Sequence, residues 1–184
     1  MRPRTTNFYR TRLPHWEVDS GLYFITMRIH GTLPLQAEAE LKALAEQRDK
    51  LEGNARRALE RRIFIQTENW LHNSRERCYL RDQAVADMVA QSIVIRHERG
   101  IWEPYEYIVM PNHIHMFIQL TDGTLRQAML AFKRWTAQQA IRMLNIKTRP
   151  FWQEDWFDHF PRSEQECERI IEYIRNNPKR KSTE

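Results

Sequence analysis

Two histidines separated by a single apolar residue are the side chains of this sequence best suited to chemistry. His113 and His115 lie in a β-favouring stretch that runs from Tyr107 to Leu120. Successive side chains of a strand point to opposite faces, so both imidazoles would share one face and Ile114 would lie on the other. Two ring nitrogens that lean the same way can converge on one divalent metal ion. The same spacing also suits a solvated or hydrogen-bonded pair, so a metal site needs support from elsewhere in the sequence.

A second group of polar side chains lies on a helix expected near the end of the sequence. Ser163 and Glu166 match a capping box, which predicts where this helix begins, and Pro178 predicts where it ends. Tyr173 and Asn177 lie one turn apart on one edge of the helix, because residues i and i+4 are neighbours on a helix surface. The apolar side chains that would face the core are Cys167, Ile170, Ile171 and Ile174.

Together these side chains could cut a phosphodiester. His113 and His115 would hold a metal ion, with the amide oxygen of Asn177 as a third ligand. The phenol of Tyr173 would be the covalent nucleophile, because a nearby cation favours loss of its proton and balances charge on the phosphate oxygens. The alternative is that Tyr173 is an aromatic residue at the border of the core and Asn177 an ordinary residue at a helix end.

Four strands are expected to carry or support this site. Their segments are rich in aromatic and β-branched residues and are Leu22–Ile29, Trp102–Met110, His113–Leu120 and Phe151–Phe157, the last as a short edge strand. The second and third are joined so tightly that they must run antiparallel. Residues 1–20 show no clear periodicity and are expected to form an irregular arm.

Helical patterns separate these strands. The segment 35–73 favours two helices separated at Gly53-Asn54, Asp82 can cap a further helix, and Thr124 can cap a long one. Strands and helices in this order predict an α+β fold, a ferredoxin-like antiparallel β-sheet with helices packed on it.

The composition predicts a single domain that spans residues 1–184. The length and a hydrophobic content of 41% are sufficient for one sizeable core, and two domains are not favoured. Segment 35–73 is expected as a helical insert and 178–184 as a basic tail. No segment has the character of a signal peptide or a membrane span, so a cytoplasmic protein without a membrane partner is expected. Cys78 and Cys167 lack the spacing of a disulfide framework or a zinc site.

Two motifs give the sequence a specific resemblance. Pro111-Asn112-His113-Ile114-His115 and Tyr173-Ile174-Arg175-Asn176-Asn177-Pro178 resemble the two motifs of the single-tyrosine HUH transposases. The similarity is closer to the REP-associated tyrosine transposases, which also have a Leu-Pro-His-Trp opening and a Tyr-Phe-Ile-Thr first strand. The resemblance implies a fold of the HUH endonuclease type, with His113 and His115 as metal ligands, Tyr173 as nucleophile and Asn177 completing the metal site.

An activity follows from this resemblance. Enzymes of that family bind an imperfect DNA hairpin, cut single-stranded DNA beside it and keep a 5′-phosphotyrosine link with a free 3′-hydroxyl. The resemblance therefore implies a Mg²⁺- or Mn²⁺-dependent DNA strand-cleaving and joining enzyme that transposes or mobilises repeats. Its partners would be single-stranded DNA and DNA hairpins, and it would act as a monomer or a homodimer. The alternatives are a non-catalytic hairpin-binding protein of the same fold and a metal-dependent phosphodiesterase that uses water as nucleophile.

Basic residues supply candidates for contact with DNA. A net charge of +5 and a pI near 9.4 favour polyanionic partners, although clusters of basic residues also occur as solvated surfaces. A cluster in the middle of the sequence consists of Arg56, Arg57, Arg61 and Arg62. The residues expected to contact DNA are Arg10, Arg12, Lys133, Arg134, Lys179, Arg180 and Lys181.

Overall fold

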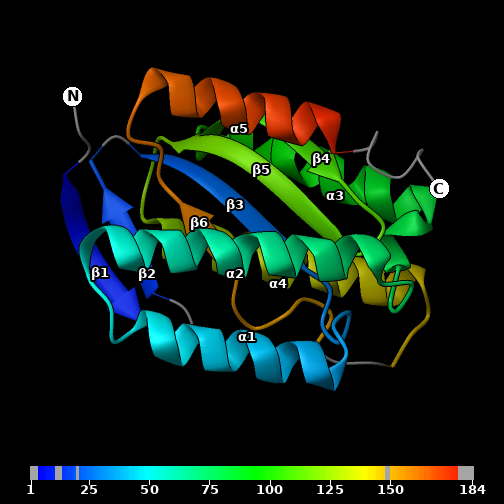
Figure 1. Ribbon diagram of the computed structural model, residues 1–184. Helices are drawn as coiled ribbons and strands as arrows, with labels where there is room; N and C mark the ends of the chain where they lie inside the picture. The colour runs from blue at the N-terminus through cyan, green and yellow to red at the C-terminus, as the bar shows by residue number, and fades with distance from the viewer. Residues whose placement is uncertain (1–3, 11–13, 20, 148–149, 178–184) are drawn as a thin grey trace. The chain divides into compact units, whose positions relative to one another are not determined.

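A four-stranded antiparallel β-sheet is the frame of the protein. The structure, a computed structural model, describes residues 4–10, 14–19, 21–147 and 150–177. The sheet has the strand order β4-β5-β3-β6, and each neighbouring pair runs antiparallel (Figure 1). The strands are β3 (Leu22–Arg28), β4 (Trp102–Val109), β5 (His113–Leu120) and β6 (Phe157–His159).

One face of this sheet carries the main hydrophobic core. The helices α3 (Gln83–Glu98) and α4 (Leu125–Met143) contribute Val89, Ile93 and Phe132 to it. The central strands alternate as the sequence predicts, because every second side chain points into this core. The fully buried residues on the core face of β3 and β5 are Tyr23, Ile25, Met27, Ile114, Met116 and Ile118.

The connectivity is that of a ferredoxin-like fold. The elements follow one another as β3, α3, β4, β5, α4 and β6, and the first strand lies between the third and the fourth in the sheet. The last helix, α5 (Glu164–Asn176), packs on the face opposite the main core, where the rings of Tyr173 and Phe24 lie 5.9 Å apart (Figure 1). The predicted α+β class and antiparallel sheet are therefore confirmed.

Residues Gly31–Cys78 form a compact unit of their own, separate from the unit that contains the sheet. It is a pair of helices, α1 (Leu35–Arg48) and α2 (Gly53–Asn73), that meet through Leu33, Ala37 and Leu71. The predicted break between two helices is confirmed, and Gly53 adopts a φ of 57°, which glycine tolerates without steric cost. The assignment of residues 1–184 to one domain with an insert over 35–73 stays a prediction.

Helix ends follow the capping chemistry of the sequence, with one correction. Thr124 and Gln127 form a complete capping box, and the Asp82 carboxylate accepts from the amide of Val85. Ser163 accepts from the amide of Glu166 as predicted, but the Glu166 carboxylate accepts from the amide of Arg162 and contacts His159 instead of closing the capping box.

No helix of the described segments is long and apolar enough to cross a bilayer. A short 3₁₀ helix, η1 (Tyr79–Arg81), precedes α3.

The prediction of an irregular N-terminal arm is wrong. Strands β1 (Thr5–Arg10) and β2 (Pro14–Val18) form an antiparallel hairpin, which is a second, two-stranded sheet. The aromatic rings of Phe8 and Trp16 face one another across the hairpin at 5.4 Å. Such cross-strand pairs stabilise short strands that have no periodic hydrophobic pattern, so inspection of either strand alone does not reveal the hairpin.

The aromatic segment after α4 also differs from its prediction. The edge strand β6 comprises Phe157–His159 and not Phe151–Phe157, and Trp152 makes only an isolated bridge to Ile29. Phe151, Trp152 and Trp156 are buried side chains of the main core. Their aromatic character therefore reflects core packing by an irregular segment whose composition is similar to that of a strand.

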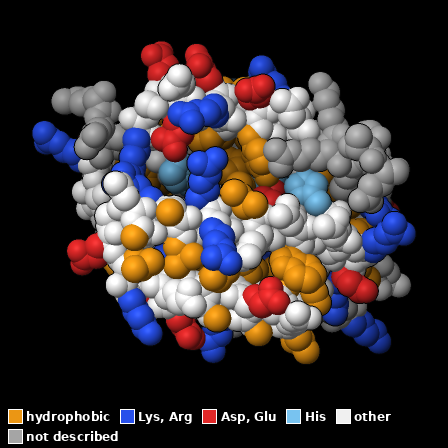
Figure 2. All heavy atoms as spheres, viewed as in Figure 1, with side chains coloured by type: hydrophobic (Ala, Val, Ile, Leu, Met, Phe, Trp, Pro, Cys, Tyr) orange, Lys and Arg blue, Asp and Glu red, His pale blue; other side chains and the backbone are white. Residues whose placement is uncertain are grey.

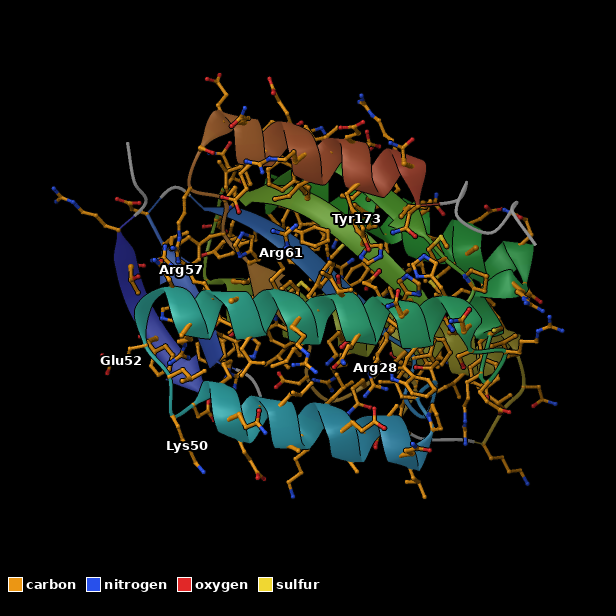
Figure 3. The ribbon with its side chains drawn as sticks, viewed as in Figure 1. Arg28, Lys50, Glu52, Arg57, Arg61 and Tyr173 are labelled. Atoms are coloured by element: carbon orange, nitrogen blue, oxygen red, sulfur yellow. The ribbon has the colours of Figure 1, made fainter. Side chains whose placement is uncertain are left out.

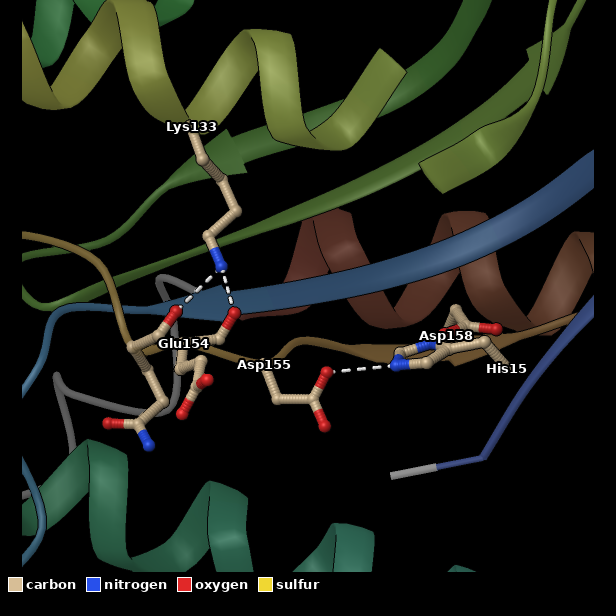
Figure 4. Close-up of polar contacts among 6 residues, drawn as sticks. His15, Lys133, Glu154, Asp155 and Asp158 are labelled. Atoms are coloured by element: carbon tan, nitrogen blue, oxygen red, sulfur yellow. Dashed lines mark hydrogen bonds and ion pairs between the residues drawn. The ribbon is translucent and has the colours of Figure 1, made fainter. Parts of the chain in front are cut away.

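A buried histidine joins the N-terminal hairpin to this segment. Both ring nitrogens of His15 contact carboxylates, with 2.8 Å from Nε2 to Asp155, and Nδ1 contacts Asp158 (Figure 4). Burial alone would lower the pKa of His15, but the hydrogen bonds to Asp155 and Asp158 outweigh it and raise the pKa to about 9. The side chain is thus an imidazolium held between two carboxylates, and it fixes β2 to the chain near β6.

The stability of the fold is expected to fall between pH 6.5 and pH 9. In the folded protein the pKa of His15 lies above its ordinary value of 6.5. The contribution of His15 to the free energy of unfolding is therefore complete below pH 6.5 and is lost as pH rises through 9. The loss is on the order of 3 kcal/mol at about 1.4 kcal/mol per unit of pKa. Urea unfolding at both pH values measures it, and NMR titration of the His15 ring should give a midpoint near 9.

The exposed His97 provides a matched control. It pairs with Glu103 at the surface, so His97→Gln should keep the pH dependence of the wild type. A His15 midpoint near 6.5, or a free energy of unfolding that is equal at both pH values, would contradict the charged buried contact.

Candidate functional site

The two histidines project from the start of β5 on the face opposite the main core. A tight connection at Pro111-Asn112 turns the chain from β4 into β5, and the amide of Met110 donates to the carbonyl of His113 at 2.9 Å. His113 and His115 are both fully buried. On the neighbouring strand β3, Arg28 pairs with His113 and Thr26 with His115, so these four side chains share one face.

Hydrogen bonds orient both imidazole rings in the same way. The Nδ1 atom of His113 lies 2.7 Å from Oδ1 of Asn112, and Nδ1 of His115 lies 2.8 Å from Oγ1 of Thr26. An amide oxygen can only accept, so Nδ1 of His113 must carry the proton, and the Thr26 oxygen can accept in the same way from His115. In neutral rings of this tautomer the Nε2 atoms hold the lone pairs.

The Nε2 atoms of the two histidines face one another at 3.1 Å. Two lone pairs at this distance repel each other, whereas a cation between them would be attracted to both. Ligand atoms that bind one ion at right angles, each about 2.1 Å from it, lie about 3 Å apart. The donor set, its tautomers and its spacing therefore fit two adjacent ligands of one divalent ion.

Helix α5 brings Tyr173 to this pair. The ring of Tyr173 lies 5.5 Å from the ring of His115 and meets it edge to face, and it also packs on Phe24 of β3 (Figure 3). Tyr173 is half-buried, and Asn177 is the fully buried C-cap of the same helix. Ile170 and Ile174 are the buried side chains that hold α5. The fold thus places a phenol beside two histidines that are nearly sixty positions earlier in the chain.

Comparison with known proteins gives this arrangement a family. Residues 70–177, more than half of the chain, match the family model described as IS200-like transposase. The chain belongs to this family. A solved structure of a REP-associated tyrosine transposase bound to a REP hairpin superposes with a TM-score of 0.53 over 93% of this chain and 74% of that one. The two share 15% sequence identity, so this similarity shows the fold, and it is the fold that the resemblance to REP-associated tyrosine transposases implies. A comparison with curated proteins found no match.

Family membership gives this transposase a role in the processing of DNA. The matched region contains β4, β5, α4, β6 and α5 and therefore includes His113, His115, Tyr173 and Asn177. It excludes β3 and the greater part of the helical unit. Thr26 and Arg28, which lie beside the histidines, are thus outside the part of the chain that the family model matches.

Sequence reasoning missed the residues that orient the histidines. Asn112 was part of the recognised motif, but its role as acceptor for His113 depends on the turn geometry. Thr26 and Arg28 lie almost ninety positions before β5, and nothing in the motif points to them. The available signal was the first strand itself: if it pairs with β5 in antiparallel register, alternate residues of that strand must face the histidines.

The basic residues predicted to contact DNA differ in their exposure to solvent, and several lie outside the described residues. Lys133 is buried, and its ammonium group donates to the carbonyl oxygens of Gln153, at 2.7 Å, and Glu154 (Figure 4). Burial lowers its pKa to about 8, and its two hydrogen bonds hold the segment after α4, so contact with DNA stays a prediction for this residue. Arg134 is exposed. The side chain of Arg10, and Arg12, Lys179, Arg180 and Lys181, lie outside the described residues. Basic side chains are scattered over the surface drawn in Figure 2.

Removing the acceptor for His115 should weaken metal binding while the fold is preserved. Thr26→Val keeps the shape of the side chain but lets the ring adopt the other tautomer, in which Nε2 carries a proton. We expect the affinity for Mn²⁺ to fall about 10- to 100-fold in Thr26→Val and in Asn112→Ala. Calorimetry measures it, with a His113→Ala, His115→Ala double variant as the reference without ligands.

Two variants control for unrelated effects. Thr26→Ser keeps the hydroxyl and should bind Mn²⁺ like the wild type. Thr121→Val removes an exposed hydroxyl that donates to the carbonyl of Gly100, and it should also leave metal binding unchanged. Wild-type affinity in Thr26→Val would show that the hydroxyl does not set the tautomer.

Proposed function

We propose that this transposase cuts and rejoins single-stranded DNA beside a hairpin through a covalent link between Tyr173 and a 5′-phosphate. The observation that carries the proposal is the convergence of the two Nε2 atoms, 3.1 Å apart, next to the ring of Tyr173. The edge-to-face contact with His115 and Phe24 holds this phenol at the site. A phenol in a fixed position beside a cation site is suited to nucleophilic attack on a phosphodiester.

His113 and His115 would hold Mg²⁺ or Mn²⁺, with the amide oxygen of Asn177 as a third ligand. Asn177 is fully buried one turn after Tyr173, so nucleophile and ligand share one helix edge. Two imidazoles and one amide leave coordination positions on the ion for phosphate oxygens and water. The bound ion would neutralise charge on the phosphate and favour ionisation of a nearby phenol.

In the proposed reaction the phenol oxygen of Tyr173 attacks the phosphorus of the scissile bond. The phenol gives up its proton as a bond forms between its oxygen and phosphorus, the bond from phosphorus to the 3′-oxygen breaks, and the leaving oxygen takes up a proton. The products are a 5′-phosphotyrosine and a free 3′-hydroxyl. Because one phosphodiester replaces another, attack by a 3′-hydroxyl reverses the step and rejoins DNA without an external energy source.

A hairpin with a single-stranded flank is the proposed DNA partner. The structural neighbour was solved with a REP hairpin, and the chain carries a net charge of +5. A binding protein of the same fold would hold such DNA without cutting it, and a phosphodiesterase that activates water would cut it without attachment to protein. The fate of the phosphate after cleavage separates these possibilities.

Loss of one oxygen atom in Tyr173→Phe should abolish the covalent product. The variant keeps the ring that packs on Phe24 and His115, so folding and hairpin binding should remain. Single-stranded DNA labelled on the 3′ side of the cut is incubated with Mn²⁺ and then separated on a denaturing gel. The wild type should give a protein-linked band, and Tyr173→Phe should give none.

Tyr105→Phe is the matched control. Tyr105 lies near Phe117 on the histidine face of the sheet, and its hydroxyl donates to Gln119 at 2.8 Å. This variant should form the covalent band as the wild type does. A band of full intensity from Tyr173→Phe would exclude Tyr173 as nucleophile, and free cleaved DNA without any band would favour attack by water.

A further inference from the structure

The helical unit carries exposed arginines that the proposed reaction does not use. Arg57, Arg61 and Arg62 are exposed along α2, and we refer to them as the arginine face. At about 100° per residue, Arg57 and Arg61 lie about 40° apart around the helix and about 6 Å apart along it. Figure 3 shows these two on the same side of α2. A rigid helix therefore presents these arginines at a fixed backbone spacing.

The charge of this face is not neutralised within the described residues. Arg57 donates only to neutral acceptors, the side-chain oxygen of Asn54 at 2.8 Å and the carbonyl of Gly53. Glu60 is paired with Arg56 at 3.1 Å. Among the described residues, no carboxylate forms an ion pair with Arg57, Arg61 or Arg62.

The arrangement is unfavourable for the helix by itself. Arg57 and Arg61 are like charges at i and i+4, which destabilise a helix by about 0.2 to 0.5 kcal/mol, and the first turn of α2 holds no acidic residue to compensate. The segment 35–73 as a whole is neutral, with seven Asp and Glu against seven Lys and Arg. Positive charge is nevertheless concentrated on α2, which has four arginines and two glutamates. An anionic partner with repeated charges would remove this repulsion.

We propose that the arginine face binds the phosphodiester backbone of the double-stranded stem of a DNA hairpin. Sites for single-stranded nucleic acid combine basic grooves with exposed aromatic platforms. The aromatic side chains of α2, Phe64 and Trp70, are partly buried, so this helix offers charge without a stacking surface. Charge at fixed spacing is sufficient for a duplex backbone, whose phosphates are regularly spaced.

This inference rests on the proposed function for its choice of DNA as the polyanion, but it concerns a different part of the chain. The family match begins at residue 70, so Arg57, Arg61 and Arg62 all precede it. They are also distinct from the histidines and Tyr173, which belong to the other compact unit. The arginine face would thus add affinity for the stem to a site that acts on the flanking strand.

The test compares two variants of the full-length protein that lose the same charge from the same unit. Arg57→Gln, Arg61→Gln removes the two arginines of the arginine face that lie one turn apart. Lys42→Gln, Lys50→Gln removes two exposed lysines in or next to α1. Affinity for a fluorescent blunt DNA hairpin and for an unstructured strand of equal length is measured from 50 to 200 mM salt. The slope of log K against log salt reports the number of phosphate contacts.

We expect the slope for the hairpin to become shallower by about 1.8 in Arg57→Gln, Arg61→Gln, at about 0.9 per duplex phosphate. The slope for the unstructured strand, and both slopes of the lysine variant, should equal those of the wild type. Arg57→Lys, Arg61→Lys should restore the hairpin slope, because the backbone is recognised by charge. Thermal unfolding shows whether each variant is folded.

An unchanged hairpin slope, an equal effect of the lysine variant, or an equal effect on the unstructured strand would overturn the assignment. A wild type that binds no hairpin would also overturn it. Failure of the proposed function is a separate outcome, because the hairpin slopes do not depend on Tyr173. If the wild type forms no covalent band but Arg57→Gln, Arg61→Gln still has the shallower hairpin slope, only the proposed reaction is refuted.

Discussion

The pairing of β3 with β5 is the constraint on which the site depends. This antiparallel register sets Thr26 opposite His115 and Arg28 opposite His113, and on the other face it aligns Ile25 and Met27 with the buried residues of β5. A shift of one residue would move every side chain to the other face and would bury the imidazoles among apolar groups. The hydrophobic face of the sheet therefore fixes the polar face, because both depend on the same register.

The sheet also explains how the two histidines, the metal ligands of the proposed function, are oriented before any ion is present. Each histidine is oriented from a different direction, His113 by the preceding residue Asn112 and His115 by Thr26 on the next strand. When both Nδ1 atoms donate in these two contacts, each Nε2 atom carries a lone pair, and an ion would not have to reorganise the rings. In that tautomer the two Nε2 atoms, 3.1 Å apart, direct their lone pairs at one another, and a bound cation would attract both.

Local patterns in the sequence predicted the elements that obey local rules. The helix break before Gly53, the caps at Asp82 and Thr124 and the alternation along β5 all depend on neighbouring residues, and all are present. Local patterns do not predict the N-terminal hairpin or the bounds of β6, because both depend on contacts with distant residues, of which the buried bridge from His15 to Asp155 and Asp158 is the clearest. The motif located the histidines and the tyrosine, whereas Thr26 could be found only from the strand pairing.

The position of Tyr173 is fixed by the number of residues between it and the start of α5. Ser163 fixes where α5 begins, and Tyr173 follows ten residues later on an unbroken helix whose side chains Ile170 and Ile174 dock on the sheet. One residue inserted or deleted between them would turn the phenol by about 100° and move it by about 1.5 Å along the axis, away from His115. A substitution at an exposed position of this helix leaves that geometry unchanged, whereas a change in the number of residues does not. Evolution of this chain should therefore accept substitutions in α5 far more readily than insertions or deletions.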